Sequence, residues 1–529
     1  MNIPLIISSA QTALGIELGS TRIKAVLVGP GCQPLAAGAF DWENRLEDGL
    51  WTYHLDDVWA GIQAAYARLA GEVREKYGVT LERVGAIGVS AMMHGYLPFD
   101  KDGRQLAPFC TWRNTVTGEE TRLLTDLFGF NIPQRWSIAH LYRAIRLGEE
   151  HVGQLGYLTT LAGYVHWKLT GQKVMGVGEA AGMFPIDSGA CGFDTGMLDK
   201  FDRIVEGAGY AWRLRDVLPQ VLPAGAAAGS LTPEGAKLLD PAGALQAGIP
   251  FCPPEGDAGT GMVATNSVAP RTGNVSAGTS IFAMVVLERP LSKVYPELDM
   301  VTTPAGRPVA MVHCNTCTSD LDAWVGLFAG LLEEAGAQLS RPRLYDLLYQ
   351  AALAGPADCG GVVSYNCYAG EPVIGLEQGR PMLARRPEEA LTLGGFMRAQ
   401  LYAAMAPLKI GMDLLLEQEK AALDELYGHG GLFKTPVVGQ RLMAGALGVP
   451  VSVMETAGEG GPWGMAVLAM FSQMGQGRSL EEYLAAEVFA GAKGSRELPR
   501  PEDRAGFAAF LERYKAGLPG ERLMGSLEL

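Results

Sequence analysis

Short apolar runs alternate with amphipathic runs along this chain. One predicted helix face carries apolar side chains at three- and four-residue spacing: Val58, Ile62, Tyr66, Leu69 and Val73. An apolar run over residues 84–89 follows this segment and is typical of a buried strand. The alternation predicts an α/β fold in which helices cover the sheets.

Two turns of the same composition interrupt pairs of apolar runs. Gly19-Ser20-Thr21 lies between strand-like runs in the first half of the chain, and Gly278-Thr279-Ser280 lies between similar runs in the second half. Glycine lets backbone N–H groups approach a phosphate, and the neighbouring hydroxyls add donors. One such turn is usually a plain hairpin turn. Two of them predict a duplicated pair of phosphate-binding turns.

The second half continues the α/β pattern. A long amphipathic helix is predicted over 391–417, then a glycine-rich turn over 428–431, a helix over 436–448 and a strand over 449–454. The stretch 224–257 is rich in Ala, Gly and Pro and connects the two halves, with a boundary near 262–270. At 529 residues, two domains are expected.

Composition excludes some classes of partner. The 43 Lys and Arg residues are outnumbered by 57 Asp and Glu residues, and no basic run stands out, so nucleic acid is not an expected partner. The apolar segment 460–471 is shorter than the ~18 residues that span a bilayer. The start of the chain lacks a basic region ahead of its apolar residues. We therefore expect a soluble, cytoplasmic protein with no membrane partner.

The eight cysteines are scattered, which favours reduced thiols over a disulfide framework. Cys314 and Cys317 form the single C-x-x-C pattern. Because no second Cys or His pair stands at metal-ligand spacing, neither a zinc site nor a redox site is favoured there.

Several polar residues follow predicted strands or turns. His94 comes just after an apolar strand, where side chains of α/β proteins reach ligands, although an isolated histidine is more often structural. Trp112 offers a flat apolar face to a sugar ring, and Asn114 offers a donor and an acceptor. Asp257 precedes a helix-compatible run, so its local sequence fits a helix N-cap as well as a general base.

The order of these segments resembles the FGGY carbohydrate kinases over residues 14–472, and the xylulokinase-like members most. The resemblance rests on short motifs, which are the first phosphate turn, Met93-His94-Gly95, Trp112-Arg113-Asn114, Leu169-Thr170-Gly171, Glu179-Ala180-Ala181-Gly182, Gly256-Asp257, the second phosphate turn and Gly430-Gly431. It implies two ribonuclease-H-like, actin-like ATPase domains with a ligand cleft between them. The expected domains are 13–263 on the sugar side, 264–490 on the nucleotide side, and a C-terminal extension, 491–529, of no assigned role.

The resemblance also implies residue roles. Asp257 would be the catalytic base, and the sugar would contact Met93, His94, Gly95, Trp112, Asn114 and Asp257. ATP would contact Gly19, Ser20, Thr21, Lys24, Gly278, Thr279, Ser280, Gly430 and Gly431. Mg²⁺ is expected to bridge phosphate oxygens, with Glu17, through water, and Asp257 as candidate metal contacts. The predicted reaction is ATP-dependent phosphorylation of a ketose or polyol hydroxyl, and a homodimer is one possible assembly.

The sequence also departs from the family pattern. Glu17 stands where Asp is usual, Tyr402 replaces an expected glutamate, and the segments 134–143 and 313–324 differ from the family signatures. Two alternatives therefore stay open on the same fold. One is an ATPase of the actin or heat-shock type, and the other is a catalytically weakened sugar-sensing protein.

Overall fold

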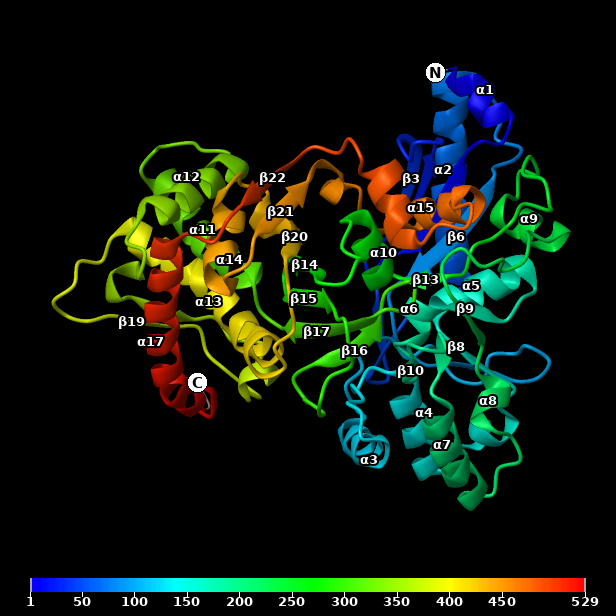
Figure 1. The fold of residues 1–529 in the computed structure, drawn as a ribbon, viewed down its shortest axis with the longest axis horizontal. Coiled ribbons are helices and arrows are strands. Elements are labelled where there is room, and N and C mark those ends of the chain that lie inside the picture. The colour runs from blue at the N-terminus through cyan, green and yellow to red at the C-terminus, as the bar shows by residue number, and fades with distance from the viewer. Residues whose placement is uncertain (1, 528–529) are drawn as a thin grey trace. The chain divides into compact units, whose positions relative to one another are not determined.

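The computed structural model describes residues 2–527, which fold into two compact units (Figure 1). Unit 1 contains the chain up to Val268 together with 300–309 and 459–491. Unit 2 contains 269–299, 310–458 and the chain from Ala492 onward. The first crossing from unit 1 to unit 2 thus falls between Val268 and Ala269. Segment 459–491, placed by sequence in the second domain, folds with unit 1.

The sheet of unit 1 has the spatial order β13-β6-β1-β2-β3. Strand β1 (Ala13–Leu18) pairs antiparallel with β2 (Arg22–Val28), which pairs antiparallel with β3 (Pro34–Asp41). On its other side β1 is parallel to β6 (Ala86–Ala91), which is parallel to β13 (Glu255–Gly256). Because the carboxyl ends of parallel strands meet at one edge, the residues that follow β1, β6 and β13 are brought to the same edge.

Helices on both sides of this sheet bury its apolar residues. Helix α2 (Leu55–Tyr77) packs on β2 and β3, and the helix-face residues predicted from Val58 to Val73 are all buried, which confirms that face. Helix α15 (Gly460–Met474) packs on β1, β2 and β6, and α10 (Asp257–Ala264) packs on α15. The approach of α15 is close, since a Cβ at Gly15 would lie 2.1 Å from the carbonyl oxygen of Pro462. Gly15 therefore cannot be enlarged without displacing α15.

The larger sheet repeats the plan of the smaller one. Its spatial order is β16 (Asp299–Thr302), β17 (Pro308–Cys314), β15 (Ile281–Val286), β14 (Thr272–Ala277), β20 (Glu425–His429), β21 (Val451–Met454) and β22 (Gly494–Glu497). Strands β14 and β15 form an antiparallel hairpin, and β14 is parallel to β20 on its other side. A hairpin beside a parallel strand thus occurs in both sheets, as the paired turns predict.

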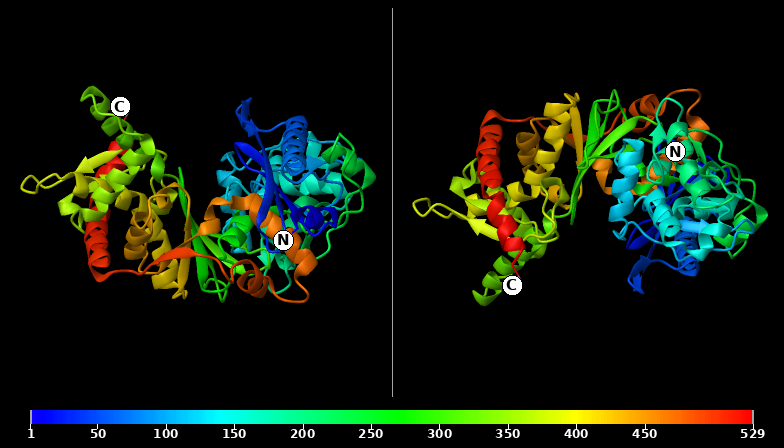
Figure 2. Two further views of the ribbon diagram at one scale, coloured as in Figure 1. Left: turned by 90° about the horizontal axis from the view of Figure 1, so that it is seen from above. Right: turned by 90° about the horizontal axis from the view of Figure 1, so that it is seen from below.

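The helices of unit 2 are α11 (Thr318–Glu334), α12 (Arg341–Ala354), α13 (Leu393–Asp413), α14 (Val438–Leu447) and α17 (Pro501–Gly525). Helix α13 ends four residues before the predicted end of 417 because the chain continues as a π-helical turn over Leu414–Gln418. Both views of Figure 2 show α17 in red against the helices of unit 2, and it packs on α14 and α13. The predicted extension is therefore an integral helix of this unit.

Shorter elements complete the described chain. The helices among them are α1 (Ile3–Ser8), α3 (Gly118–Phe128), α4 (Ser137–Leu147), α5 (Leu161–Thr170), α6 (Val177–Ala180), α7 (Thr195–Gly207), α8 (Leu214–Val217), α9 (Pro233–Leu239) and α16 (Leu480–Tyr483). The strands are β4 (Arg45–Glu47), β5 (Leu50–Thr52), β7 (Leu97–Phe99), β8 (Tyr157–Thr159), β9 (Val174–Gly176), β10 (Ile186–Asp187), β11 (Gly192–Phe193), β12 (Gln220–Leu222), β18 (Val363–Tyr365) and β19 (Met382–Ala384). Within residues 2–527, no helix has both the length and the apolar character needed to cross a bilayer.

Candidate active site

Asp257 lies at the sheet edge of unit 1, directly after β13. It is the first residue of α10, whose N-cap is Gly256, so the helix-cap role considered from sequence is not the one observed. Its Oδ1 instead accepts a hydrogen bond from the Met93 backbone N–H at 3.2 Å. The fold thereby joins two predicted segments that are 164 residues apart in the chain.

The Asp257 carboxyl is open to solvent. Desolvation raises its pKa above the ordinary aspartate value, while the N–H groups of Met93 and Ala258 oppose that rise. The residue is nevertheless exposed. The carboxyl is accessible as a proton acceptor.

The segment after β6 has an unusual backbone. His94 has a φ of 70° and Gly95 a φ of 95°, and a positive φ in a non-glycine residue stores strain of about 1–3 kcal/mol. Neighbours hold the strained segment in place. The Gly95 N–H donates to the Arg135 carbonyl at 3.2 Å, and Ser137 Oγ donates to the Gly95 carbonyl at 2.5 Å. His94 Nδ1 lies 3.3 Å from the Gly182 carbonyl oxygen, which makes it the donor.

The Trp112-Arg113-Asn114 segment is divided between exposed and buried side chains. Trp112 is 37% exposed and keeps part of its face free for a ring. Asn114 is buried, and its amide binds the Trp51 backbone through Oδ1 at 2.9 Å and Nδ2 at 2.8 Å. The Arg113 guanidinium lies 3.9 Å from the centre of the Trp51 ring. Asn114 therefore fixes the strand that carries Trp51, and contact with a hydroxyl would require it to exchange partners.

The first phosphate turn is anchored through its carbonyl groups. The Gly19 carbonyl accepts from Trp42 Nε1 at 2.7 Å, and the Ser20 carbonyl accepts from the Tyr53 hydroxyl at 2.6 Å. The Thr21 carbonyl accepts from the Trp42 backbone N–H at 3.1 Å. Trp42 and Tyr53 were missed by the sequence reasoning, since only the fold brings their polar groups to the turn.

Glu17 and Lys24 are opposite each other in the β1–β2 ladder beside this turn. The pKa of Glu17 is raised to about 7, mainly by burial. The positive charge of Lys24 opposes this rise, and the negative charge of Asp257 adds to it. Glu17 Oε2 is buried without a hydrogen-bond partner among residues 2–527. A Cβ at Gly461 would lie 2.3 Å from that oxygen. Glu17 thus keeps one unused oxygen near the predicted base.

In unit 2 the second phosphate turn is also anchored through its carbonyls. The Gly278 carbonyl accepts from the Thr318 N–H at 3.0 Å and from its hydroxyl at 2.7 Å, and the Thr279 carbonyl accepts from the Cys317 N–H at 2.8 Å. These donors begin α11. No heavy atom lies within 4 Å of a Cβ built at Gly278, so the space in front of this glycine is open. Ser280 ends the turn, and its carbonyl accepts from the Gly278 N–H at 2.9 Å.

Gly430 and Gly431 lie next to the second phosphate turn because β20 runs parallel to β14. Gly430 has a φ of 99°, and a Cβ there would lie 2.5 Å from the Ala277 carbonyl oxygen. The position therefore requires glycine for both its backbone angle and its close approach. The structure brings together these two predicted nucleotide segments of unit 2.

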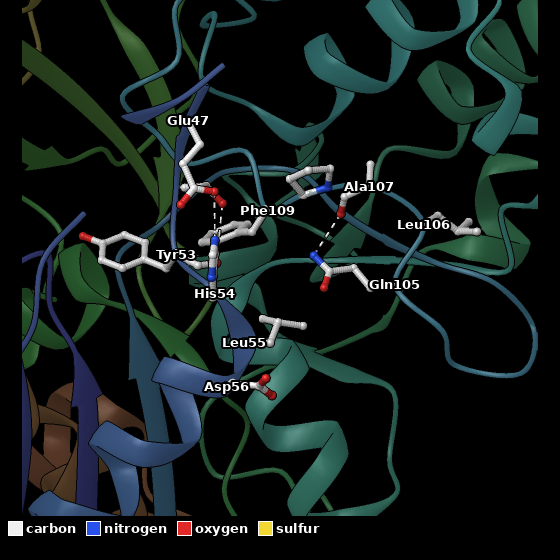
Figure 3. A pocket seen from close by; sticks show the side chains of 11 residues that line it. Glu47, Tyr53, His54, Leu55, Asp56, Gln105, Leu106, Ala107 and Phe109 are labelled. Atoms are coloured by element: carbon white, nitrogen blue, oxygen red, sulfur yellow. Dashed lines mark hydrogen bonds and ion pairs between the residues drawn. The ribbon is translucent and has the colours of Figure 1, made fainter. Parts of the chain in front are cut away.

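Unit 1 contains a cavity of about 490 Å³, and two residues of its wall contact predicted site segments (Figure 3). Its wall includes Tyr53, whose hydroxyl binds the first phosphate turn, and Phe109, whose ring would lie 2.8 Å from a Cβ at Gly95. The His54 and Glu47 side chains meet at 2.9 Å on the same wall. None of the predicted site residues lines it.

Comparisons with known proteins match both halves of the chain. The model of the N-terminal domain of the FGGY family of carbohydrate kinases matches residues 12–138, and the model of its C-terminal domain matches residues 273–473. The xylulose kinase of Escherichia coli (strain K12) is 24% identical over 294 residues, covering 53% of this chain and 55% of that protein. The chain therefore spans about half the length of this curated relative in the alignment.

Two solved structures from Lactobacillus acidophilus share the fold over nearly the whole chain. The ligand-bound xylulose kinase has a TM-score of 0.78 at 16% identity, covering 96% of this chain and 98% of that chain. The gluconate kinase has a TM-score of 0.78 at 17% identity, covering 97% and 98%. Together with the hairpin plan repeated in the two sheets, these likenesses show the fold of the chain, which has two ribonuclease-H-like, actin-like domains.

Within this fold class, the two matched domain models identify the family. The chain belongs to the FGGY family of carbohydrate kinases. The two matches confirm the resemblance to this family of carbohydrate kinases that the motifs indicated.

Proposed function

We propose that this chain transfers the γ-phosphoryl group of ATP to a hydroxyl of a ketose or polyol, with Asp257 as general base. The observation that carries the proposal is the hydrogen bond between Asp257 and Met93, which joins the carboxyl to the strained His94–Gly95 segment. As the hydroxyl oxygen attacks the γ-phosphorus, its proton passes to the Asp257 carboxylate. The bond between the γ-phosphorus and the bridging oxygen breaks, and ADP leaves with that electron pair.

The sugar would bind to unit 1. His94 would accept a hydrogen bond from a sugar hydroxyl at Nε2, because Nδ1 donates to the Gly182 carbonyl. Trp112 would cover one face of the sugar with its exposed ring. Met93 and Gly95 would form the backbone wall beside them. Asn114 would act through Trp51, whose backbone it holds.

Each unit contains residues that we assign to the nucleotide. In unit 2 the phosphates would approach Gly278-Thr279-Ser280, where the space is open, and the adenine would lie on Gly430-Gly431. In unit 1 the Gly19-Ser20-Thr21 turn and Lys24 would supply donors and a positive charge to the transferred phosphate. Both turns are held rigid by bonds to their carbonyls, which supports a binding surface that is formed before ATP arrives.

The donors present fit Mg²⁺, which usually takes one or two protein carboxylates together with substrate phosphates and water. Glu17 has an unpaired buried oxygen, and its charge is coupled to that of Asp257. These two residues would hold the ion. The chemistry that a bound Mg²⁺ would supply there is positive charge that offsets the negative charge developing on the phosphate. No group of three or more His, Cys, Asp or Glu side chains within residues 2–527 forms a separate metal site.

A five-carbon ketose is the acceptor we favour, because the E. coli relative is a xylulose kinase. The gluconate kinase neighbour shows that sugar acids must be tested beside it. We also propose a cytoplasmic enzyme, while a homodimer stays a prediction without a surface to support it.

The direct test is ATP consumption with D-xylulose, D-ribulose, glycerol and gluconate in turn. We expect turnover with a ketose. Binding of ATP without turnover on any of them would favour the sugar-sensing alternative.

Gly278→Val tests the nucleotide assignment, since its side chain would fill open space and should weaken ATP binding at least about 10-fold while leaving the melting temperature unchanged. Gly71→Val on the exposed face of α2 is the matched control, and equal ATP affinity in both variants would refute the assignment.

A further inference from the structure

Glu179 is a buried carboxyl for which the fold supplies no partner. It lies on the short helix α6, is 0% exposed, and neither side-chain oxygen has a hydrogen bond among residues 2–527. The Thr160 hydroxyl is near enough to moderate its pKa, but the geometric hydrogen bond of that hydroxyl goes to Met175 Sδ at 3.8 Å. An unpaired buried polar group destabilises the folded state, so its retention needs a reason.

The surroundings of Glu179 connect it to the predicted sugar side. A Cβ at Gly256 would lie 2.4 Å from Glu179 Oε2 and 2.2 Å from Met93 Cγ. The carboxyl is therefore in contact with the residue just before Asp257, and the Met93 side chain lies beside it. Three residues further along, the Gly182 carbonyl holds the ring of His94. The segment from Glu179 to Gly182 therefore contacts both Gly256, the residue before Asp257, and the ring of His94.

The neighbouring carboxyl, Glu255, is built differently. It is also buried, but Oε1 accepts from the Gly178 N–H at 3.2 Å and Oε2 from the Gly256 N–H at 3.4 Å. Glu255 therefore connects α6 to β13 and has a structural task. Glu179 is also buried, but its carboxyl forms no hydrogen bond that would connect two elements of the described chain.

We propose that Glu179 recognises the sugar next to Asp257 by hydrogen-bonding one of its hydroxyls when the Met93 side chain moves aside. Met93 suits this role because methionine is unbranched and has flexible torsions. Burial, with Glu255 and Asp257 adding to it, raises the pKa of Glu179 well above the ordinary glutamate value. A protonated carboxyl can both donate to and accept from a hydroxyl. The inference rests on the proposed function of this site.

The test compares stability with kinetics in Glu179→Met and Glu179→Gln, using D-xylulose and D-ribulose. Glu179→Met removes an unpaired polar group at similar length, so its melting temperature should equal or exceed that of the parent. Its kcat/KM for the sugar should fall at least about 10-fold, with KM for ATP unchanged. Glu179→Gln keeps a donor and an acceptor and should recover most of the activity. Glu255→Met is the control and should melt lower, because it leaves two N–H groups unpaired.

Unchanged sugar kinetics in Glu179→Met would overturn the inference. So would a joint loss of melting temperature and activity, which defines a structural role. A parent that phosphorylates none of the tested sugars contradicts the proposed function instead. In that case the shift in melting temperature on adding D-xylulose tests the contact. A shift that occurs in the parent and disappears in Glu179→Met supports the contact. No shift in the parent, or the same shift in both proteins, contradicts it.

Discussion

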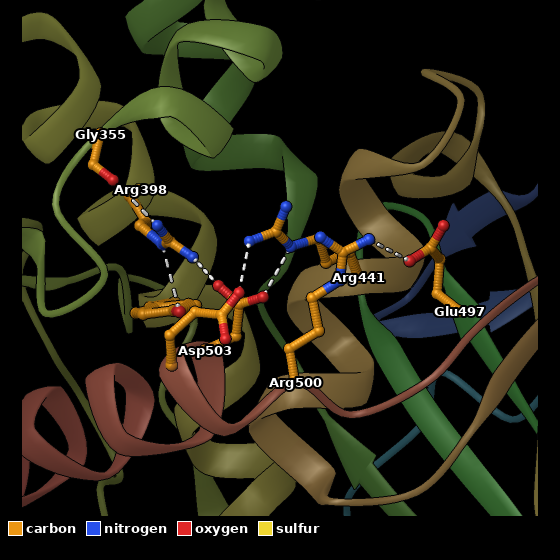
Figure 4. A network of polar contacts seen from close by, with 8 residues as sticks. Gly355, Arg398, Arg441, Glu497, Arg500 and Asp503 are labelled. Atoms are coloured by element: carbon orange, nitrogen blue, oxygen red, sulfur yellow. Dashed lines mark hydrogen bonds and ion pairs between the residues drawn. The ribbon is translucent and has the colours of Figure 1, made fainter.

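Buried carboxyls in the two units have opposite surroundings. In unit 2, Asp503 is 0% exposed, and both of its oxygens bind arginines: Oδ1 pairs with Arg398, and Oδ2 accepts from Arg441 Nε at 2.6 Å (Figure 4). Arg398 also donates to the Gly355 carbonyl at 3.0 Å and to the Tyr402 hydroxyl at 3.2 Å. In unit 1, Glu179 and Glu255 are equally buried, yet neither forms an ion pair among the described residues.

The difference separates two uses of a buried charge. Asp503 joins α17 to α13 and α14, so its charge is compensated where three helices meet. A buried ion pair does little for net stability compared with apolar packing, but removing one member leaves an uncompensated charge. In unit 1, Glu179 contacts Gly256, the residue before the predicted base, and Glu255 lies two residues before that base. Asp503, whose charge is compensated, should therefore report on stability, whereas Glu179, which has no hydrogen-bond or ion-pair partner among the described residues, should report on function.

The largest effect is expected at Asp257. Asp257→Asn keeps the shape of the side chain and removes proton acceptance, so kcat should fall about 10²- to 10⁴-fold with little change in sugar or ATP affinity. Its melting temperature should not fall, because the carboxyl forms no ion pair within the described chain. Steady-state kinetics and a melting curve on the same preparation decide it. Parental turnover in the variant would remove Asp257 as the base.

Asp503→Ala should give the opposite pattern. The buried Arg398 guanidinium and the partly exposed Arg441 guanidinium would lose their partner, and the free energy of unfolding should fall by about 3–5 kcal/mol. Chemical denaturation measures this loss. The control is Asp41→Ala, which breaks an exposed pair with Arg22 and should cost less than about 1 kcal/mol. Equal losses of unfolding free energy in the two variants would show that the buried pairs of Asp503 stabilise the fold no more than the exposed pair of Asp41 does.

Tyr402 shows how far the sequence could predict this region. The sequence places it in a long helix and marks it as a departure from the family pattern, and the helix is observed. Its partners were not predictable, since its ring packs on Phe507 and Phe510 of α17 more than 100 residues further along the chain. Local periodicity specifies a helix and its buried face, whereas the choice of partner depends on how distant helices dock.

The candidate site divides in the same way. The glycine at 430 was predictable, because its positive φ and its close approach to Ala277 limit which residue fits there. The amide of Asn114 was not, because its hydrogen bonds go to Trp51, 63 residues away. Glu179 was noticed only as part of a motif, and its burial and missing partner depend on the packing of α6 against β13. Side-chain roles that rest on contacts distant in sequence require the fold.

The smallest expected effect concerns Glu371, a buried acid of unit 2 that forms no ion pair within the described chain. It is 0% exposed, and its Oε2 accepts from the Asn315 N–H at 2.9 Å while Oε1 has no partner within the described chain. Burial raises its pKa to about 8, against the opposing effect of backbone N–H groups including that of Asn315. The nearby Cys314 and Cys367 thiols have raised pKa values and stay neutral in this range.

Because the folded pKa of Glu371 exceeds the ordinary value of 4.5, the folded state binds more protons between pH 4.5 and about 8. Its contribution to stability is complete below pH 4.5 and is lost as the pH rises through about 8. Glu371→Gln cannot ionise, so the parent should melt at progressively lower temperature than the variant from pH 5 to pH 9, by at most several degrees. Glu43→Gln, at an exposed position, is the control and should show no such trend. A difference between parent and Glu371→Gln that stays constant over this range would mean that Glu371 is ionised throughout, and that burial without a cation does not by itself keep an acid neutral in this protein.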